Sequence, residues 1–117
     1  LFSLQERVRL VTDSLAELGI EGVGVEIIPT GVLLAEYAAQ RGASALVKGL
    51  RSGTDYGYEA PMASMNRHLS KVETVFLAGE DRYGGVSSTI IREVASLGGD
   101  VRPFVPQVVA HALAQRH

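Results

Sequence analysis

Segments with helical spacing alternate along this chain with short apolar segments, and this alternation is the feature that most restricts its fold. The pattern predicts helices over residues 4–18, 32–41, 55–69 and 87–97, and a last helix that runs from Pro106 towards His117. It predicts strands over residues 23–27, 45–47 and 74–78. Strands that alternate with helices are joined by right-handed crossovers into a parallel sheet with helices on both faces. The sequence therefore predicts an α/β fold with a doubly wound parallel sheet.

Length and composition predict one soluble globular domain over residues 1–117. The hydrophobic content is 46% and the charged content 21%, and no apolar run is long enough to span a membrane. A capping box formed by Ser3 and Glu6 starts the first helix almost at once. Three strands are few for such a sheet. We therefore expect that the first strand and helix of the domain are missing from this sequence.

Net charge and cysteine content restrict partners and compartment. The net charge of −2 gives no general attraction for nucleic acid or anionic lipid, so neither is expected as a partner. The chain has no cysteine, which excludes disulfides and thiolate metal sites and is compatible with the cytoplasm. The three histidines share no metal-ligand spacing, so no metal ligands are assigned. No nucleophile, base and orienting group stand together, which gives covalent catalysis no support.

Two cations follow the second predicted strand, where ligands bind in open parallel sheets. Lys48 and Arg51 flank Gly49, and we expect the two cations to be three residues apart around one turn after a buried strand. A lysine point charge and a planar arginine fork together suit phosphate oxygens, and the glycine admits a ligand close to the backbone. A solvated pair of surface charges is the alternative.

Residues 84–93 (GGVSSTIIRE) join two glycines to three hydroxyl residues at a predicted helix start. A helix N-terminus presents unpaired N–H groups and a positive dipole end, which favours anions. Ser87, Ser88 and Thr89 add hydroxyl donors, and Arg92 adds a charge one turn later. We interpret this segment as a phosphate-binding helix start. The alternative is an ordinary N-cap, which would explain one of the three hydroxyls.

Three motifs together resemble a known family. Residues 86–92 (VSSTIIR) are similar to the signature of the Rossmann-like nucleotidylyltransferases. Among these, residues 48–51 (KGLR), residues 65–69 (MNRHL), and Asp55 with residues 58–59 resemble the bacterial phosphopantetheine adenylyltransferases. The resemblance extends over essentially the whole chain, with the motifs in the same order and with similar gaps. It marks residues 1–117 as the C-terminal part of a nucleotidylyltransferase domain.

The resemblance implies adenylyl transfer from ATP to phosphopantetheine, giving dephospho-coenzyme A and pyrophosphate. It implies Mg²⁺ as cofactor, a cytoplasmic homohexamer, and dephospho-coenzyme A or coenzyme A as product or feedback ligand. Lys48 would hold the acceptor phosphate and Arg51 the ATP phosphates, and with Ser88 they are the catalytic residues that we assign. The nucleotide would contact Gly49, Leu50, Arg51, Glu59, Tyr83, Gly84, Gly85, Val86, Ser87, Ser88 and Thr89. The acceptor would contact Leu34, Lys48, Met62, Asn66 and Glu93.

The sequence also departs from the family pattern. The family's first strand and helix carry a histidine motif that is absent here, so we expect the 117-residue chain alone to catalyse the transfer poorly. Gly57 stands where an acidic residue is usual, and Gly84-Gly85 replaces bulkier residues. Pro61 is tolerated only in a first helical turn, so the third helix is expected to begin later than in relatives.

Several interpretations remain open from the residues alone. A same-fold alternative is a nucleotidylyltransferase for another phosphorylated acceptor. A different class is a non-catalytic subunit that binds nucleotide or coenzyme A. We rank a module that serves only in assembly last, because that role explains neither the pair Lys48 and Arg51 nor the cluster at residues 87–92. Met62 and Met65, with Tyr58, are interpreted as core residues on their own pattern, and Glu59 as a carboxylate early in a helix, where it favours the dipole.

Overall fold

The computed structural model describes all residues from Leu1 to His117. They form two compact units, which we call the helical unit (Leu1–Ile27 and Gly85–His117) and the sheet unit (Ile28–Gly84). None of the helices is both long and apolar enough to cross a membrane. The elements in chain order are α1 (Leu4–Glu17), α2 (Leu34–Gln40), β1 (Ala45–Leu50), α3 (Gly53–Ser70), β2 (Glu73–Ala78), the 3-10 turn η1 (Asp81–Tyr83), α4 (Ser88–Ser96) and α5 (Gln107–Ala114).

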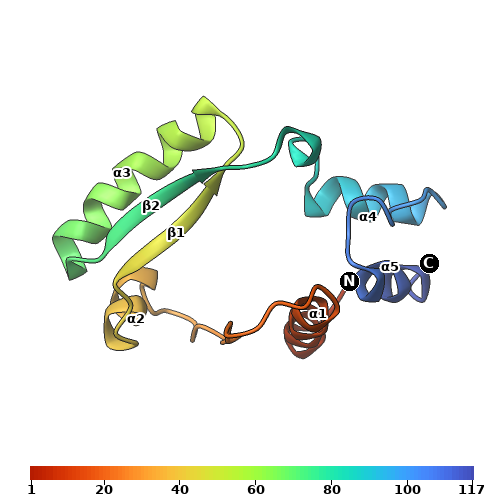
Figure 1. Ribbon diagram of the computed structural model, residues 1–117, viewed down its shortest axis with the longest axis horizontal. Coiled ribbons are helices and arrows are strands. Elements are labelled where there is room, and N and C mark those ends of the chain that lie inside the picture. The colour runs from red at the N-terminus through yellow and green to blue at the C-terminus, as the bar shows by residue number, and fades with distance from the viewer. The chain divides into compact units, whose positions relative to one another are not determined.

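In the sheet unit, β1 and β2 are parallel strands joined through α3. The register pairs Ala45 with Glu73 at one end and Leu50 with Ala78 at the other. Figure 1 shows α3 lying along one face of the two strands. Because a crossover helix must pack back onto its sheet, this β–α–β unit confirms the predicted α/β class with parallel strands.

The opposite face of the two-stranded sheet is exposed and apolar. Val47, Val75 and Leu77 alternate with the residues that face α3, and Val47 is 66% exposed. The prediction of a buried strand at residues 45–47 is therefore wrong, since only one face of β1 is covered by a helix. The strand is also longer than predicted and includes Lys48, Gly49 and Leu50.

The predicted strand over residues 23–27 is not formed. These residues have no assigned strand, and Val23 and Ile27 are exposed. The sheet pairs β1 with β2 and does not include this segment, which forms no ladder of backbone hydrogen bonds. Alternating side chains describe an extended backbone, but a strand exists only when a partner completes its ladder.

The helix α3 begins at Gly53 and continues through Pro61, so the expectation that Pro61 lies in its first turn is wrong. Its start is fixed by Ser52, whose hydroxyl oxygen accepts a hydrogen bond from the Asp55 N–H at 3.2 Å. Pro61 cannot donate to the carbonyl of the residue four positions earlier, which is the exposed Gly57. Because Gly57 is exposed, water can bind that carbonyl and the helix continues.

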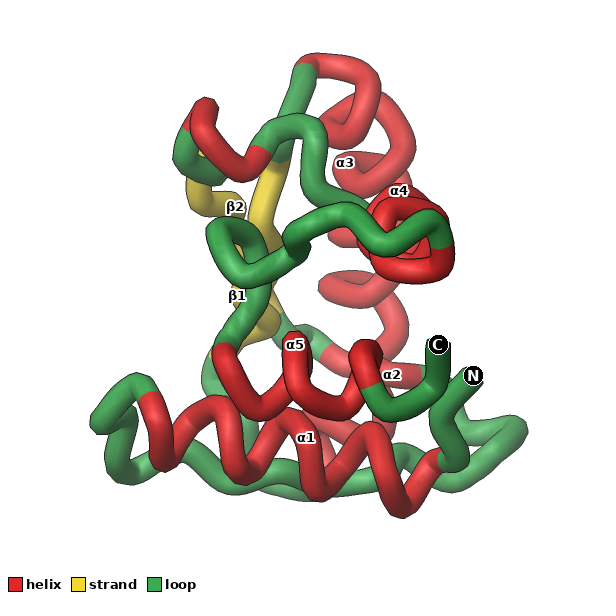
Figure 2. Tube along the Cα trace, turned by 90° about the vertical axis from the view of Figure 1, so that its right-hand side faces the viewer, coloured by secondary structure: helices red, strands yellow, loops and turns green.

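The helical unit is built around three buried side chains, Ile91, Val101 and Leu113. They come from α4, from the loop after it and from α5, and α5 also lies along α1 (Figure 2). The predicted capping box of α1 is confirmed: the Ser3 N–H donates to Glu6 at 2.7 Å and the Glu6 N–H donates to Ser3 Oγ at 3.2 Å.

The loop between α4 and α5 is held by a glycine and an ion pair. Gly98 follows the end of α4 with a φ of +79°, a left-handed backbone that glycine favours after a helix. Beyond it, Asp100 accepts hydrogen bonds from Arg102 Nε at 2.8 Å and Nη2 at 2.9 Å. These bonds and one from the Arg102 N–H lower the pKa of the Asp100 carboxyl to about 2. The loop therefore keeps this ion pair at any pH near neutrality.

A carboxylate from α1 caps the N-terminus of α5. Pro106 is the N-cap residue and offers no side-chain hydrogen bond. Glu17 supplies it instead, because its two oxygens accept from the Gln107 N–H at 2.8 Å and the Val108 N–H at 3.2 Å. No local pattern predicts this cap, since the residues lie far apart in the sequence.

Replacing Glu17 with alanine is expected to lower the free energy of unfolding by about 0.5–2 kcal/mol, the usual cost of a lost helix cap. Urea denaturation followed by circular dichroism measures this change. Glu21→Ala is the control, because it removes an exposed carboxylate from the same unit without touching α5. Equal midpoints for the two variants would contradict the capping role.

Candidate active site

The motif Lys48–Arg51 lies at the carboxyl end of β1. Lys48 and Gly49 belong to the strand and Arg51 follows it directly, so the prediction that the two cations share one turn is wrong. In a strand successive side chains point to opposite faces. The Lys48 side chain is half-buried beside α3, with 32% of its surface exposed, whereas Arg51 is 55% exposed.

Each cation meets a carboxylate from α3. Lys48 Nζ lies 3.1 Å from Glu59 Oε2, and Arg51 Nε lies 3.5 Å from Asp55 Oδ2. Asp55 also accepts a hydrogen bond from the Arg51 N–H at 3.0 Å. Asp55 occupies the first turn of α3, whereas Glu59 lies beyond it, so Glu59 pairs with Lys48 instead of favouring the helix dipole as the sequence predicted.

Three of these side chains, Arg51, Asp55 and Glu59, line a small polar pocket of about 330 Å³, whereas Lys48 lies outside its lining. It is lined by Gly49, Arg51, Asp55, Tyr58 and Glu59. The structure thus brings together three of the residues assigned to the site from the sequence and adds Asp55 and Tyr58, which belong to the quoted motifs but had no assigned contact. Both additions could have been found from spacing, because residues 55, 58 and 59 fall on one side of a helix. No group of three or more His, Asp or Glu side chains in the chain could hold a metal ion.

The hydroxyl cluster lies at the start of α4 in the helical unit. Ser87 is the N-cap, and its Oγ accepts the Ile90 N–H at 3.2 Å. A hydroxyl that accepts a cap bond still has a proton to donate. Ser88 and Thr89 are the first residues of α4 and are exposed. Arg92 Nε donates to the Ser88 carbonyl at 3.1 Å. The ordinary N-cap therefore accounts for Ser87 and leaves the other two hydroxyls without a structural role.

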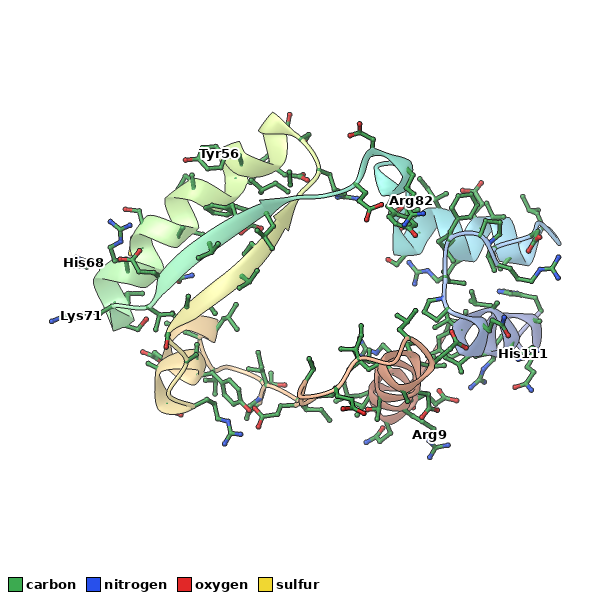
Figure 3. The ribbon with its side chains drawn as sticks, viewed as in Figure 1. Arg9, Tyr56, His68, Lys71, Arg82 and His111 are labelled. Carbon is green, nitrogen blue, oxygen red and sulfur yellow. The ribbon has the colours of Figure 1, made fainter.

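The segment before the hydroxyls contains a cluster that the sequence did not reveal. Arg82 Nε lies 2.7 Å from Glu80 Oε2, and its guanidinium lies 4.5 Å from the centre of the Tyr83 ring. Figure 3 labels Arg82 at this turn. Gly84 is close to the backbone, since an added Cβ would lie 3.2 Å from the Asp81 carbonyl oxygen. Gly85 and Val86 connect this turn to α4.

The residues assigned to the acceptor differ in exposure. Leu34 begins α2 and is 38% exposed, and Met62 is 55% exposed on α3. Asn66 is buried, and its carbonyl accepts the Ser70 hydroxyl at 2.9 Å. Glu93 is an exposed residue of α4.

The apolar side chains of α3 form an exposed stripe. It consists of Tyr58, Met62, Met65 and Leu69, all more than half exposed. The interpretation of the methionines and Tyr58 as core residues is therefore wrong, because α3 faces the sheet with its other side. His68, labelled in Figure 3, is also exposed on this helix.

Comparison with known proteins identifies the family. Residues 1–94 match the model of the cytidylyltransferase-like family. The chain is 56% identical over 108 residues to the phosphopantetheine adenylyltransferase of Renibacterium salmoninarum. The aligned residues make up 92% of this chain and 66% of that protein. The enzyme of the same name from Pseudarthrobacter chlorophenolicus is 55% identical over 112 residues, covering 96% of this chain and 66% of the relative. That from Corynebacterium glutamicum is 46% identical over all 117 residues and 71% of its own length.

This chain thus spans about two thirds of the length of these relatives. The match to the Corynebacterium glutamicum enzyme covers the whole chain and therefore includes residues 48–51 and residues 84–93. The chain belongs to the cytidylyltransferase-like family and, within it, to the phosphopantetheine adenylyltransferases.

Proposed function

We propose that the protein to which this chain belongs transfers the adenylyl group of ATP to phosphopantetheine, with dephospho-coenzyme A and pyrophosphate as products. The observation that carries the proposal is the pair of cations, Lys48 and Arg51, at the carboxyl end of a parallel strand and beside a polar pocket. Ligands of open α/β sheets bind at this end of the strands. The names of the similar proteins supply the acceptor.

In this reaction an oxygen of the acceptor phosphate attacks the α-phosphorus of ATP. The new oxygen–phosphorus bond forms as the bond from the α-phosphorus to the bridging oxygen breaks, and pyrophosphate leaves with the electron pair. Such transfers need positioning and charge stabilisation more than covalent help from the protein. Lys48 would hold the acceptor phosphate, and Arg51 would bind the ATP phosphates through its planar fork.

The remaining contacts follow from position and chemistry. Gly49 and Leu50 would let the nucleotide approach the backbone of β1, and Glu59 would accept hydrogen bonds from its hydroxyl or amino groups. The segment from Tyr83 to Thr89 would bind the rest of ATP, with Ser88 and Thr89 donating to phosphate at the N-terminus of α4. Exposed Leu34 and Met62, with Asn66 and Glu93, would contact the pantetheine arm.

The proposal extends to cofactor, assembly and location. Since this chain supplies no cluster of metal ligands, its residues do not fit a protein-held Mg²⁺ site, and Mg²⁺ would come bound to the ATP phosphates. We propose that residues 1–117 are part of one nucleotidylyltransferase domain. We further propose a cytoplasmic homohexamer that binds coenzyme A as a feedback ligand.

Pyrophosphate release by the full-length protein tests this function. ATP and phosphopantetheine together should give pyrophosphate and dephospho-coenzyme A, while either substrate alone should not. Faster release with another phosphorylated acceptor, or with CTP, would favour a different nucleotidylyltransferase. Binding of dephospho-coenzyme A without any turnover would favour a non-catalytic binding subunit.

A further inference from the structure

The ion pair between Lys48 and Glu59 joins two residues to which the proposed function gives different ligands. Lys48 Nζ and Glu59 Oε2 are 3.1 Å apart, and only about a third of each side chain is exposed, 32% and 35%. Partial burial weakens the screening by water, so this contact is stronger than one between fully exposed charges. Glu59 is therefore the counter-ion of Lys48 in this structure.

The backbone holds this pair in place. The Lys48 side chain lies on the face of β1 that α3 covers. The Glu59 side chain lies on the side of α3 that faces this lysine. One turn earlier Asp55 makes the corresponding contact with Arg51. Asp55 and Glu59 are four residues apart on the helix, so two carboxylates face the cations of this site. Any phosphate that reaches Lys48 also meets the negative charge of Glu59.

We propose that Glu59 is a competing counter-ion for Lys48, and that the acceptor phosphate binds Lys48 by displacing this carboxylate. Glu59 thereby lowers the affinity for the acceptor when no nucleotide is bound. A nucleotide that donates hydrogen bonds to Glu59 draws the carboxylate away and leaves Lys48 ready for phosphate. This inference rests on the proposed function, because it assigns the two ligands to the two residues as that function does.

The consequence is positive coupling between the two substrates. If the nucleotide removes the competing carboxylate, it must tighten acceptor binding, and the acceptor must tighten nucleotide binding by the same factor. Partly exposed ion pairs contribute up to about 1 kcal/mol, which corresponds to a coupling of roughly two- to fivefold. The coupling favours formation of the complex that holds both substrates.

Glu59→Gln in the full-length protein tests the competition by calorimetric titration with phosphopantetheine and, separately, with inorganic phosphate. The variant keeps the shape of the side chain and removes its charge. Glu73→Gln is the matched control, because Glu73 belongs to the same unit and pairs with Arg67 at 2.9 Å, outside the pocket. Without nucleotide, Glu59→Gln should bind phosphopantetheine about two- to fivefold more tightly than the control. A non-hydrolysable ATP analogue should increase the affinity of the control for phosphopantetheine and leave the affinity of Glu59→Gln unchanged.

The outcomes separate this inference from the proposed function. Equal or weaker binding of both probes by Glu59→Gln would overturn the competition, while turnover by the unaltered protein would keep the proposed function. The unaltered protein could instead fail to bind phosphopantetheine while Glu59→Gln binds inorganic phosphate more tightly than the control. That result would reject phosphopantetheine as the acceptor and would support the competition between Glu59 and phosphate for Lys48.

Discussion

Replacing Lys48 with alanine is expected to weaken phosphopantetheine binding about 10- to 150-fold, while ATP binding changes much less. A hydrogen bond to a charged group contributes about 1.5–3 kcal/mol, and the variant also leaves the Glu59 carboxylate without its counter-ion. Calorimetric titration of the full-length protein with each ligand measures both affinities. Arg51→Ala is expected to give the reverse pattern, with the larger loss for ATP.

Two matched variants control for the loss of a positive charge. Lys71→Ala removes the other lysine of the chain, an exposed residue at the end of α3. Arg67→Ala removes an arginine that, like Arg51, pairs with a carboxylate of the same unit. Neither control should change ligand binding. Equal losses of both ligands in Lys48→Ala and Arg51→Ala would contradict the separate roles of the two cations.

Replacing Leu113 with alanine is expected to lower the free energy of unfolding by about 2–5 kcal/mol. Leu113 is 3% exposed and packs with Ile91 and Val101 in the centre of the helical unit. The truncation removes buried apolar contacts and leaves a cavity that the surrounding helices can fill only in part. Since domains are stable by only about 5–15 kcal/mol, this is a large fraction of the total.

Urea denaturation of the full-length protein measures this loss. Leu97→Ala is the control, because it is the same substitution in the same unit at a side chain that is 80% exposed. Its midpoint should stay near that of the unaltered protein, in keeping with the small effect of surface substitutions. A midpoint for Leu113→Ala close to that of Leu97→Ala would show that the packing around α5 contributes little to stability.

Capping residues in the sequence predicted where helices begin when the hydrogen bonds of the cap join residues three positions apart. Ser3 with Glu6 and Ser87 with Ile90 form the hydrogen bonds that their spacing indicates, so α1 and α4 begin as expected. The motif at residues 48–51 also led to the pocket, because its position after an apolar run marks the end of a strand. Interactions of this kind span only three or four residues, and the sequence displays them directly.

Features that depend on distant partners were not predictable in this way. Residues 23–27 alternate like a strand, yet no neighbour completes a ladder for them. Tyr58 and Met62 have core-like spacing, yet the sheet packs against the other side of α3. Pro61 should end a helix by local rules, yet α3 continues through it. In each case the outcome depends on what lies beside the segment in space.

The sequence by itself therefore determined the α/β class, the starts of α1 and α4, and the family to which the chain belongs. Only the tertiary structure decided that Glu17 caps α5 and that Glu59 meets Lys48. The physical reason is the range of the interactions. Caps and helical periodicity act between residues close in the chain, whereas ion pairs between elements and the burial of a face depend on how those elements pack.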